Sequence, residues 1–267
     1  MSWLCRLAII CWNRISHSVG NTNVSTDSAK WQKNLAALLG EEERVRTASM
    51  EAIVQSVALN DHLSLMHEVF DVLVAHTRGH RHASEDELAI QLLGIRMANT
   101  LAASLKLGLS GYYQTALHVA RDVLELTNLL DYFLDHPEVI EAWRKSAQRE
   151  RSRDFGPAAI RKALDERDGL SNRKREHIYK VFSEYAAHAS PAGARMIAPE
   201  GRAKMGPFFD AKLLDAFLSE IALRYGFAAL VFALHLDDVS EPVQHAKLDY
   251  MTKLQVWRDK YLPKVAA

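Results

Sequence analysis

The chain has 267 residues, of which 48% are hydrophobic, so it can build a substantial core in one large domain or two small ones. Thirty-three basic residues balance thirty-three acidic ones, which excludes a global field that would draw the protein onto nucleic acid or an anionic membrane. The two cysteines, Cys5 and Cys11, exclude a disulfide framework, and the expected compartment is cytoplasmic.

Residues 1–30 are expected to form a flexible leader. The opening MSWLCRLAIICW is interrupted by Arg6, and the uncharged run that follows is too short for a signal peptide. The next stretch is rich in Ser, Thr and Asn. We therefore favour a disordered or weakly membrane-contacting leader over a secretion signal.

The remainder is predicted to be all-α, because proline is absent before Pro137 and apolar residues recur at helical spacing. Residues 31–84 form the N-terminal helices. Between Trp31 and Asn60 we expect one long helix, or two helices joined near Gly40. Another helix is expected from His62 to His76.

Residues 85–236 are predicted to form the main helical bundle. Ser84 and Glu87 have the spacing of a capping box, so a helix should start there and run to Lys106. A short β-hairpin, or alternatively a plain loop, is expected near 195–206, where Pro199 and Gly201 lie. Further helices are expected around Trp143 and over Pro157–Arg167, Ser171–Ala189 and Asp210–Leu236.

Residues 237–267 are predicted to hold one C-terminal helix, Pro242–Tyr261. The longest late apolar run, Tyr225–Leu236, is shorter than the about 20 residues of a membrane-spanning helix, so no integral membrane association is expected. The predicted core members are Tyr112, Leu117, Val123, Leu124, Leu130, Phe182, Phe217 and Leu230.

A line of polar residues runs through GYYQTALHVARDVLELTNLLDYF at spacings of three and four, which places five side chains on one line of a helix. Apolar residues flank this polar ladder on both sides, so it is a candidate for an enclosed site or for a structural polar contact. Arg121 and Glu125 are four residues apart and are predicted to form a salt bridge. The ladder consists of Gln114, His118, Arg121, Glu125 and Asn128.

A second candidate is His188 in YKVFSEYAAHASP, near the end of a predicted helix. It continues the line of Val181 and Tyr185, so its ring is expected to point inward. A general acid or base needs a partner within hydrogen-bonding reach, which Arg121, Glu125 or Tyr185 would supply. The alternative is a helix-terminal residue without a catalytic role.

Metal and cofactor sites are not expected. His76, His80 and His82 in HTRGHRH lack the further ligand and the spacing of a metal site. The sequence contains no Walker loop, GxGxxG, HExxH, nucleophile elbow or CxxC motif.

Two basic clusters are candidates for phosphate contacts. Interspersed acidic residues favour a solvated helix face instead. The clusters are Arg144, Lys145, Arg149, Arg151 and Arg153, and then Arg173, Lys174 and Arg175.

The segments LSGYYQTALHVARDVLELTNLLDYFLDHPEVIEAWRK, HIYKVFSEYAAHASP and MIAPEGRAKMGPFFD resemble an uncharacterised bacterial family of helical domains of the HEPN type. The resemblance covers about residues 85–236. The residues that carry it are Arg121 and Glu125 of ARDVLE, and Ser183, Glu184, Tyr185 and His188 of SEYAAH.

This resemblance implies a nucleic-acid-directed bundle, because many HEPN proteins are metal-independent ribonucleases of toxin or phage-defence systems, while others bind nucleotides or partners. The ribonucleases carry an arginine and a histidine separated by four to six residues on one helix. Val181, Phe182 and Ser183 occupy positions of that kind here, so catalysis requires Arg121 to replace the missing arginine in space. HEPN bundles often pair, which also implies a homodimer.

The leading hypothesis is a protein that acts on or binds RNA or a nucleotide, with ribonuclease activity as one form. His188 would be the acid or base, Arg121 would stabilise phosphate charge, and Glu125 would orient Arg121. The candidate supporting residues are His118, Asn128, Ser183, Glu184 and Tyr185.

Two alternatives remain at this point. One is a non-enzymatic interaction protein in which the same residues form a buried polar contact. The other is a small-ligand binder that uses the space between the ladder helix and the 171–189 helix. The ribonuclease hypothesis requires Arg121 and His188 to meet in an open cleft. A small-ligand binder instead requires an enclosed, mostly apolar pocket.

Overall fold

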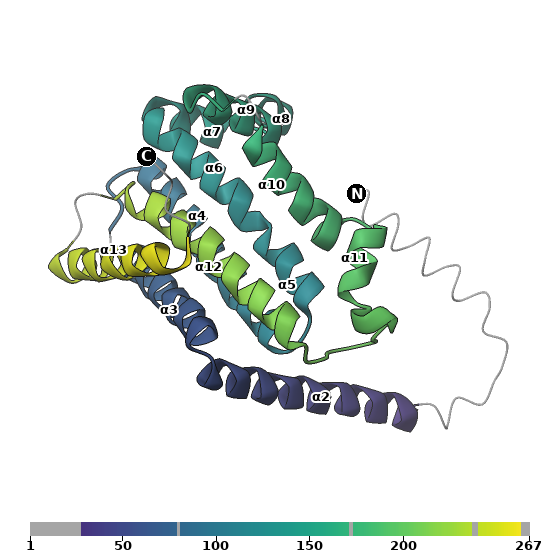
Figure 1. Ribbon diagram of the computed structural model, residues 1–267. Helices are drawn as coiled ribbons and strands as arrows, with labels where there is room; N and C mark the ends of the chain where they lie inside the picture. Colours follow the sequence, from purple (N-terminus) through teal and green to yellow (C-terminus); the bar gives the residue numbers. More distant parts are fainter. Residues whose placement is uncertain (1–27, 79–80, 171–172, 237–239, 263–267) are drawn as a thin grey trace. The chain divides into compact units, whose positions relative to one another are not determined.

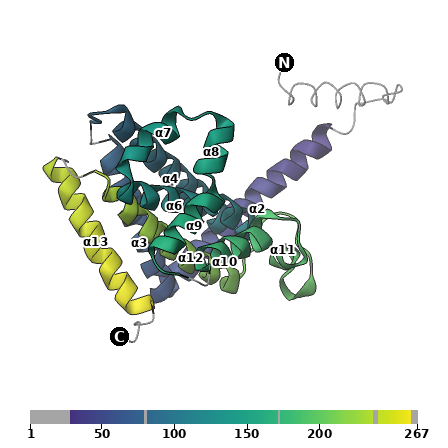
Figure 2. The same cartoon turned by 90° about the horizontal axis from the view of Figure 1, so that it is seen from above.

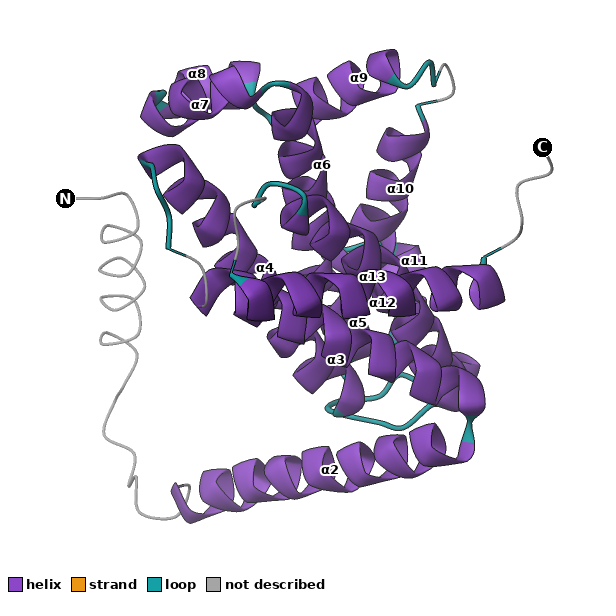
Figure 3. Cartoon of the chain, turned by 90° about the vertical axis from the view of Figure 1, so that its left-hand side faces the viewer, coloured by secondary structure: helices purple, strands orange, loops and turns teal. Residues whose placement is uncertain are grey.

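The computed structural model describes residues 28–78, 81–170, 173–236 and 240–262, and every regular element in these ranges is a helix (Figure 3). The prediction of an all-α, multi-helix fold is therefore confirmed. The elements are α2 (Ser28–Gln55), α3 (Val57–Arg78), α4 (Glu85–Leu109), α5 (Tyr113–Ala120), α6 (Asp122–Asp135), η1 (Pro137–Val139), α7 (Ile140–Lys145), α8 (Gln148–Asp154), α9 (Pro157–Arg167), α10 (Lys174–Phe182), η2 (Ser183–Ala187), α11 (Pro191–Met196), η3 (Pro199–Gly201), α12 (Ala211–Ala233) and α13 (Glu241–Tyr261).

The chain divides into two compact units, residues 1–41 and 42–267. The first unit contributes the start of α2 to the described residues, and most of the predicted leader, including both cysteines, lies outside them. The second unit contains all the later helices, so the predicted site residues belong to one unit.

In the core of the second unit, α12 packs against α3, α6 and α4, and its contact with α4 is the closest to a helix backbone. Phe217 and Phe232 of α12 are almost fully buried, and their rings lie against Gly108 and Gly94 of α4. A Cβ atom at Gly108 would stand 2.1 Å from Phe217 Cε1, and one at Gly94 would stand 2.3 Å from Phe232 Cζ. These glycines let the aromatic rings reach the α4 backbone, which close packing requires.

Helix α13 packs against α3, beside which it lies in Figures 1 and 2. Trp257 Nε1 donates a hydrogen bond to Nδ1 of the buried His62 at 2.9 Å. Tyr261 donates its hydroxyl hydrogen to Asp61 Oδ2 at 2.6 Å. The contact thus combines apolar surface with a buried histidine whose polar partner comes from α13.

Two helices, α4 and α12, are long and apolar enough to cross a membrane by length and composition. Of their most apolar stretches, 50% and 56% are buried inside the protein. Core helices of a soluble bundle have the same property, so these helices are weak evidence for a membrane span.

Local end signals were predicted well where capping residues mark them. Ser84 accepts a hydrogen bond from the Glu87 N–H at 3.1 Å, and Asp210 accepts one from the Lys212 N–H at 2.9 Å. Helix α9 starts at Pro157, as expected of proline in a first turn.

Of the two alternatives for the first helices, the single helix holds at Gly40: α2 continues through this residue, where a helix tolerates glycine when nothing else ends it, and it ends at Gln55, before the predicted limit at Asn60. The hairpin predicted near 195–206 was wrong: the end of α11 is followed by η3, since Pro199 and Gly201 favour a tight turn.

The predicted core is confirmed in part. Tyr112 is half-buried and not part of the core, and its hydroxyl donates a hydrogen bond to Glu42 at 2.8 Å. Leu117 and Leu230 are half-buried against the core, and Leu124 is also half-buried. The fully confirmed members are Val123, Leu130, Phe182 and Phe217.

Candidate functional site

The polar ladder lies on α5 and α6, and α10 runs alongside them (Figure 1). The backbone hydrogen-bond pattern is interrupted at Arg121, although the φ and ψ angles of this residue remain helical. Gln114 Nε2 donates to the carbonyl oxygens of Tyr185 and Gly193 at 3.1 and 3.0 Å. His118 is exposed, and the other four ladder residues are half-buried, so the predicted enclosure is partial.

At the centre of the ladder, Arg121 and Glu125 form the predicted salt bridge, with Nη2 and Oε1 3.2 Å apart. Both residues also contact Tyr179 of α10. The tyrosine hydroxyl accepts a hydrogen bond from Arg121 and donates one to Glu125 at 3.1 Å, and its ring centre lies 4.4 Å from the Arg121 guanidinium carbon. This arrangement ties α10 to α6.

A second guanidinium, that of Arg161 on α9, lies 4.1 Å from the centre of the same Tyr179 ring. Arg161 is only 9% exposed, and within the described residues it makes no hydrogen bond and no ion pair. Its Nη1 atom is buried without a partner in this part of the chain. Burial lowers the pKa of the Arg161 guanidinium, and the nearby carboxylates of Glu125 and Glu176 oppose that shift. The side chain is a buried cation with unused donors, an arrangement that is costly unless a partner is supplied.

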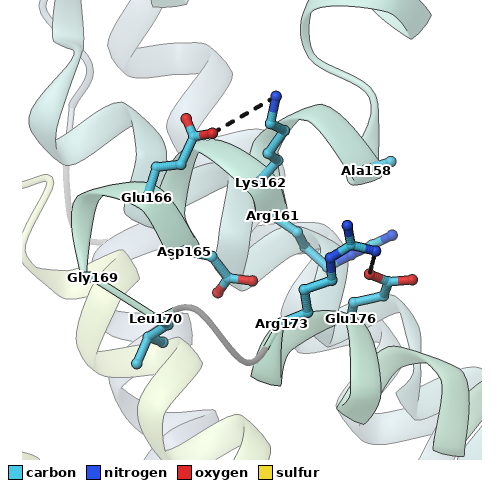
Figure 4. A pocket seen from close by; sticks show the side chains of 9 residues that line it. All are labelled: Ala158, Arg161, Lys162, Asp165, Glu166, Gly169, Leu170, Arg173 and Glu176. Atoms are coloured by element: carbon cyan, nitrogen blue, oxygen red, sulfur yellow. Dashed lines mark ion pairs between the residues drawn. The ribbon is translucent and has the colours of Figure 1, made fainter.

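Arg161 lines an open hollow of about 660 Å³ between α9 and α10 (Figure 4). In that view Arg161 extends toward Arg173, just before α10, and toward Glu176 of α10, while Lys162 and Glu166 lie at the other side. The acidic residues of the hollow each have a cationic partner. These pairs are Asp165 with Arg175 at 2.8 Å, Glu166 with Lys162 at 3.7 Å, and Glu176 with Lys180 at 2.6 Å. Among the charged residues that line the hollow, Arg161 is the one for which the described chain supplies no such partner.

The hollow also lies at the N-terminus of α10. Arg173, which precedes this helix, has a φ angle of 48°, a left-handed conformation uncommon for a residue with a side chain. Its side chain does not cap the helix. Since the first N–H groups of a helix lack intrahelical acceptors, this end adds backbone donors beside Arg161.

A network of arginine and aspartate side chains fixes α6, α9 and α10 together around the hollow. Arg167 bonds to Asp131 at 2.9 Å, and Arg175 bonds to Asp165 at 2.8 Å. Hydrogen bonds from Arg167 and then Arg175 lower the pKa of Asp168 to about 2. The walls of the hollow are therefore held by ion pairs in addition to the buried apolar side chains of Ile160 and Leu164 on α9.

The SEYAAH residues lie away from Arg121. The predicted 171–189 helix is α10 followed by a π-helical turn, η2, and His188 comes after that turn. The inward orientation predicted for His188 was wrong, since the residue is exposed and its ring makes no hydrogen bond or ion pair in the described chain. Arg121 instead contacts Tyr179, which lies nine residues before His188, a separation of roughly 13 Å along a helix.

The supporting candidates of this segment do not form a cluster with the ladder either. Ser183 is buried, with its hydroxyl oxygen unpartnered among the described residues. Glu184 is exposed, and its backbone oxygen accepts a hydrogen bond from Ser190. Tyr185 is 42% exposed. Together with Leu117 and Met196, Tyr185 lines an open, mostly apolar hollow of about 540 Å³ between η2 and α12, which differs from the enclosed pocket required of a small-ligand binder.

Several side chains of the basic clusters and of the histidine cluster already have partners within the protein. Arg144 pairs with Asp86 at 2.8 Å, and Arg153 pairs with Asp154 at 2.6 Å. His76 is buried, with Nδ1 2.8 Å from the Val72 carbonyl oxygen. His82 is exposed, and His80 lies outside the described residues. Within the described chain, no group of three or more metal-ligating side chains lies together.

Sequence patterns alone did not identify Arg161 or Tyr179. The available signal for Arg161 was its place between Ile160 and Leu164 in PAAIRKALDER, where helical spacing puts it beside the buried face of α9. For Tyr179, the signal was its spacing in HIYKVF, one residue after the apolar Ile178.

Comparisons with known proteins add no assignment: no protein-family model, no curated protein and no solved structure matches this chain at a significant level. The HEPN-like resemblance has no support from them. The family, the homodimer and the cytoplasmic location therefore stay predictions, and the function has to be argued from the site itself.

Proposed function

We propose that this protein binds a phosphate-bearing ligand, either a nucleotide or a segment of RNA, at the hollow between α9 and α10, and that it binds without cleaving. The observation that carries the proposal is Arg161, a buried guanidinium that forms no ion pair or hydrogen bond in the described chain. A phosphate oxygen at this position would accept hydrogen bonds from the guanidinium and neutralise its charge.

Three neighbouring features support a phosphate as the ligand. The N-terminus of α10 offers backbone N–H groups beside the hollow. The Arg173 and Lys162 side chains line the same hollow, and Arg173 is 81% exposed, so it can reorient toward an anion. The carboxylates of the hollow already have cationic partners, so they need not repel a ligand as isolated charges would.

Binding without cleavage is proposed because the predicted catalytic pair does not converge. Arg121 already bonds to Glu125 and Tyr179, and His188 is exposed beyond η2. A general acid and a phosphate-stabilising arginine have to reach the same phosphodiester.

The test is calorimetric titration of the full chain with pyrophosphate, AMP and ATP at low, stated ionic strength, since phosphate contacts weaken with salt. Arg161→Met should abolish binding. Arg149→Met is the matched control, since Arg149 is exposed on α8 and does not line the hollow. Equal binding by wild type and Arg161→Met would refute this site.

A second assay incubates RNA with the protein without added metal. We expect intact RNA with wild type. Cleavage that disappears in both His188→Ala and Arg121→Ala would replace the binding proposal with the ribonuclease hypothesis.

A further inference from the structure

A groove on the other side of α9 contains an aromatic side chain at its centre. Two adjoining hollows of about 520 and 360 Å³ share the residues Leu93, Arg96, Trp143 and Arg151, so they form one continuous groove over α4, α6, α7 and α8. Trp143 is half-buried, and its ring packs edge-on against Phe133, with 5.4 Å between ring centres. The buried contact holds the indole in place while part of it faces the groove.

The remaining lining of the groove suits a planar heterocycle. Phe155 provides a second aromatic ring, and Asn128 and Gln148 provide amide groups that both donate and accept hydrogen bonds. No hydrogen bond of either amide occurs among the described residues. Stacking on an aromatic ring combined with amide hydrogen bonds is the chemistry by which proteins hold an unstacked base.

The charges of this groove are mostly neutralised, which argues against a phosphate as its occupant. Arg96 bonds to Asp122 through two nitrogens, at 2.7 and 2.5 Å. Arg144 pairs with Asp86, and Arg151 donates to the Ser146 carbonyl oxygen at 3.0 Å. A guanidinium engaged at its edge still offers its flat face for stacking, so these arginines favour a base over a second phosphate.

The groove and the α9–α10 hollow are joined by direct contacts. Glu125 lines the groove and accepts a hydrogen bond from the Tyr179 hydroxyl at 3.1 Å, and the Tyr179 ring lies 4.1 Å from the Arg161 guanidinium. Ile160 lines the groove, and the next residue of the helix, Arg161, lines the hollow. A flexible chain of nucleotides has to cross only α9 to occupy both.

We infer that the ligand is a single-stranded oligonucleotide, with one unstacked base against Trp143 in this groove and a backbone phosphate at Arg161. This inference rests on the proposed phosphate site and names its substrate class. The groove contributes a base-binding subsite whose recognition is sequence-tolerant, since every base has a face that stacks.

The experiment titrates the full chain with fluorescein-labelled ten-nucleotide RNA, with the same strand lacking bases, and with pyrophosphate. Trp143→Leu should weaken oligonucleotide binding about tenfold, since one base stack has that order of value. The variant should leave binding of the abasic strand and of pyrophosphate unchanged. Intrinsic fluorescence of wild type should be quenched by the RNA, and this quenching should be lost in Trp143→Leu.

Because Trp143 also contacts Phe133, a second variant tests the groove without disturbing the core. Arg151→Met should weaken oligonucleotide binding several-fold, whereas Arg149→Met on the same helix should not, since Arg149 does not line the groove.

The outcomes separate the two proposals. Equal affinity of wild type for the RNA and for the abasic strand, or unchanged RNA affinity in both Trp143→Leu and Arg151→Met, would overturn the base subsite while pyrophosphate binding could still depend on Arg161. Pyrophosphate binding that is unchanged in Arg161→Met would overturn the phosphate site and, with it, the assignment of the backbone phosphate.

Discussion

Helices α4 and α12 meet through apolar surfaces, whereas α9 and α10 meet α6 through charged side chains. In the first contact, two glycines admit two phenylalanine rings to the helix backbone. In the second contact, Arg167 and Arg175 bridge aspartates from different elements. Apolar packing carries most of the stability of a bundle, and ion pairs fix geometry at modest net gain.

The difference shows where a ligand site can arise. At the α4 glycines, the apolar contact presents the carbon atoms of two phenylalanine rings. The region where α9 and α10 meet α6, here called the charged corner, pairs its carboxylates but leaves Arg161 buried without an ion pair in the described chain. Proteins commonly retain such a costly feature where function requires it, which is why we propose the binding site at this corner.

The largest effect is expected from Gly108→Ala in the apolar contact. The new Cβ would stand 2.1 Å from Phe217 Cε1, inside the core, so the ring has to move. We expect a loss of about 1–3 kcal/mol in the free energy of unfolding, measured in urea. Gly40→Ala is the control, since nothing lies within 4 Å of its Cβ, and it should be neutral or raise stability by up to about 1 kcal/mol. Equal behaviour of the two variants would contradict the tight packing of α4 against α12.

Next in size is Tyr179→Phe, which keeps the ring between α9 and α6 but removes the hydroxyl that bonds to Arg121 and Glu125. Leaving half-buried charged groups without one hydrogen bond should lower stability by about 1.5 kcal/mol in the same urea assay. Tyr185→Phe is the matched control, because its hydroxyl makes no hydrogen bond in the described chain and the residue is 42% exposed. A neutral result for Tyr179→Phe would mean that the polar contact contributes nothing to the charged corner.

The contact between α3 and α13 contains a titratable group, the buried His62. The stability of this contact should therefore depend on pH. Burial, the largest cause, lowers the pKa of His62, with Asp215 and Asp61 opposing the shift and Lys260 adding to it. A folded-state pKa below the unfolded value of about 6.5 gives stability that is present above pH 6.5 and is lost as the pH falls toward the folded value.

Protonation of His62 Nδ1 would also remove the acceptor of the Trp257 hydrogen bond. We expect a loss on the order of 1 kcal/mol between pH 7.5 and 5.5, followed by tryptophan fluorescence in urea. His62→Asn should reduce this pH dependence, and an unchanged slope in that variant would assign it to other groups.

The smallest effect has the opposite sign. Arg161→Met replaces a buried, unpaired cation by an apolar side chain of similar length, so stability should rise by up to about 1 kcal/mol while phosphate binding is lost. Arg149→Met, at an exposed position, should leave both quantities unchanged. A clear loss of stability in Arg161→Met would show that its contact with Tyr179 stabilises the corner more than its burial costs.

Several parts of the fold were predictable because their signals are local. Ser84 caps the helix that it was expected to precede, Asp210 lies at the expected start of α12, and Pro157 starts α9. The Arg121–Glu125 bridge follows from a four-residue spacing on one helix. Such features depend on residues within one turn of each other, so they survive whatever the rest of the chain does.

The sequence by itself thus determined an all-α protein, the starts of α4, α9 and α12, and the salt bridge at the centre of the polar ladder. Only the tertiary structure decided that Arg161 is buried while Arg149 is exposed, and that His188 points to solvent. Helical periodicity tells which residues share a face, but it does not tell which other helix covers that face. Which helix covers a face decides whether a side chain is buried, and thus the free-energy cost of a charge there. This packing depends on contacts between residues far apart in the chain.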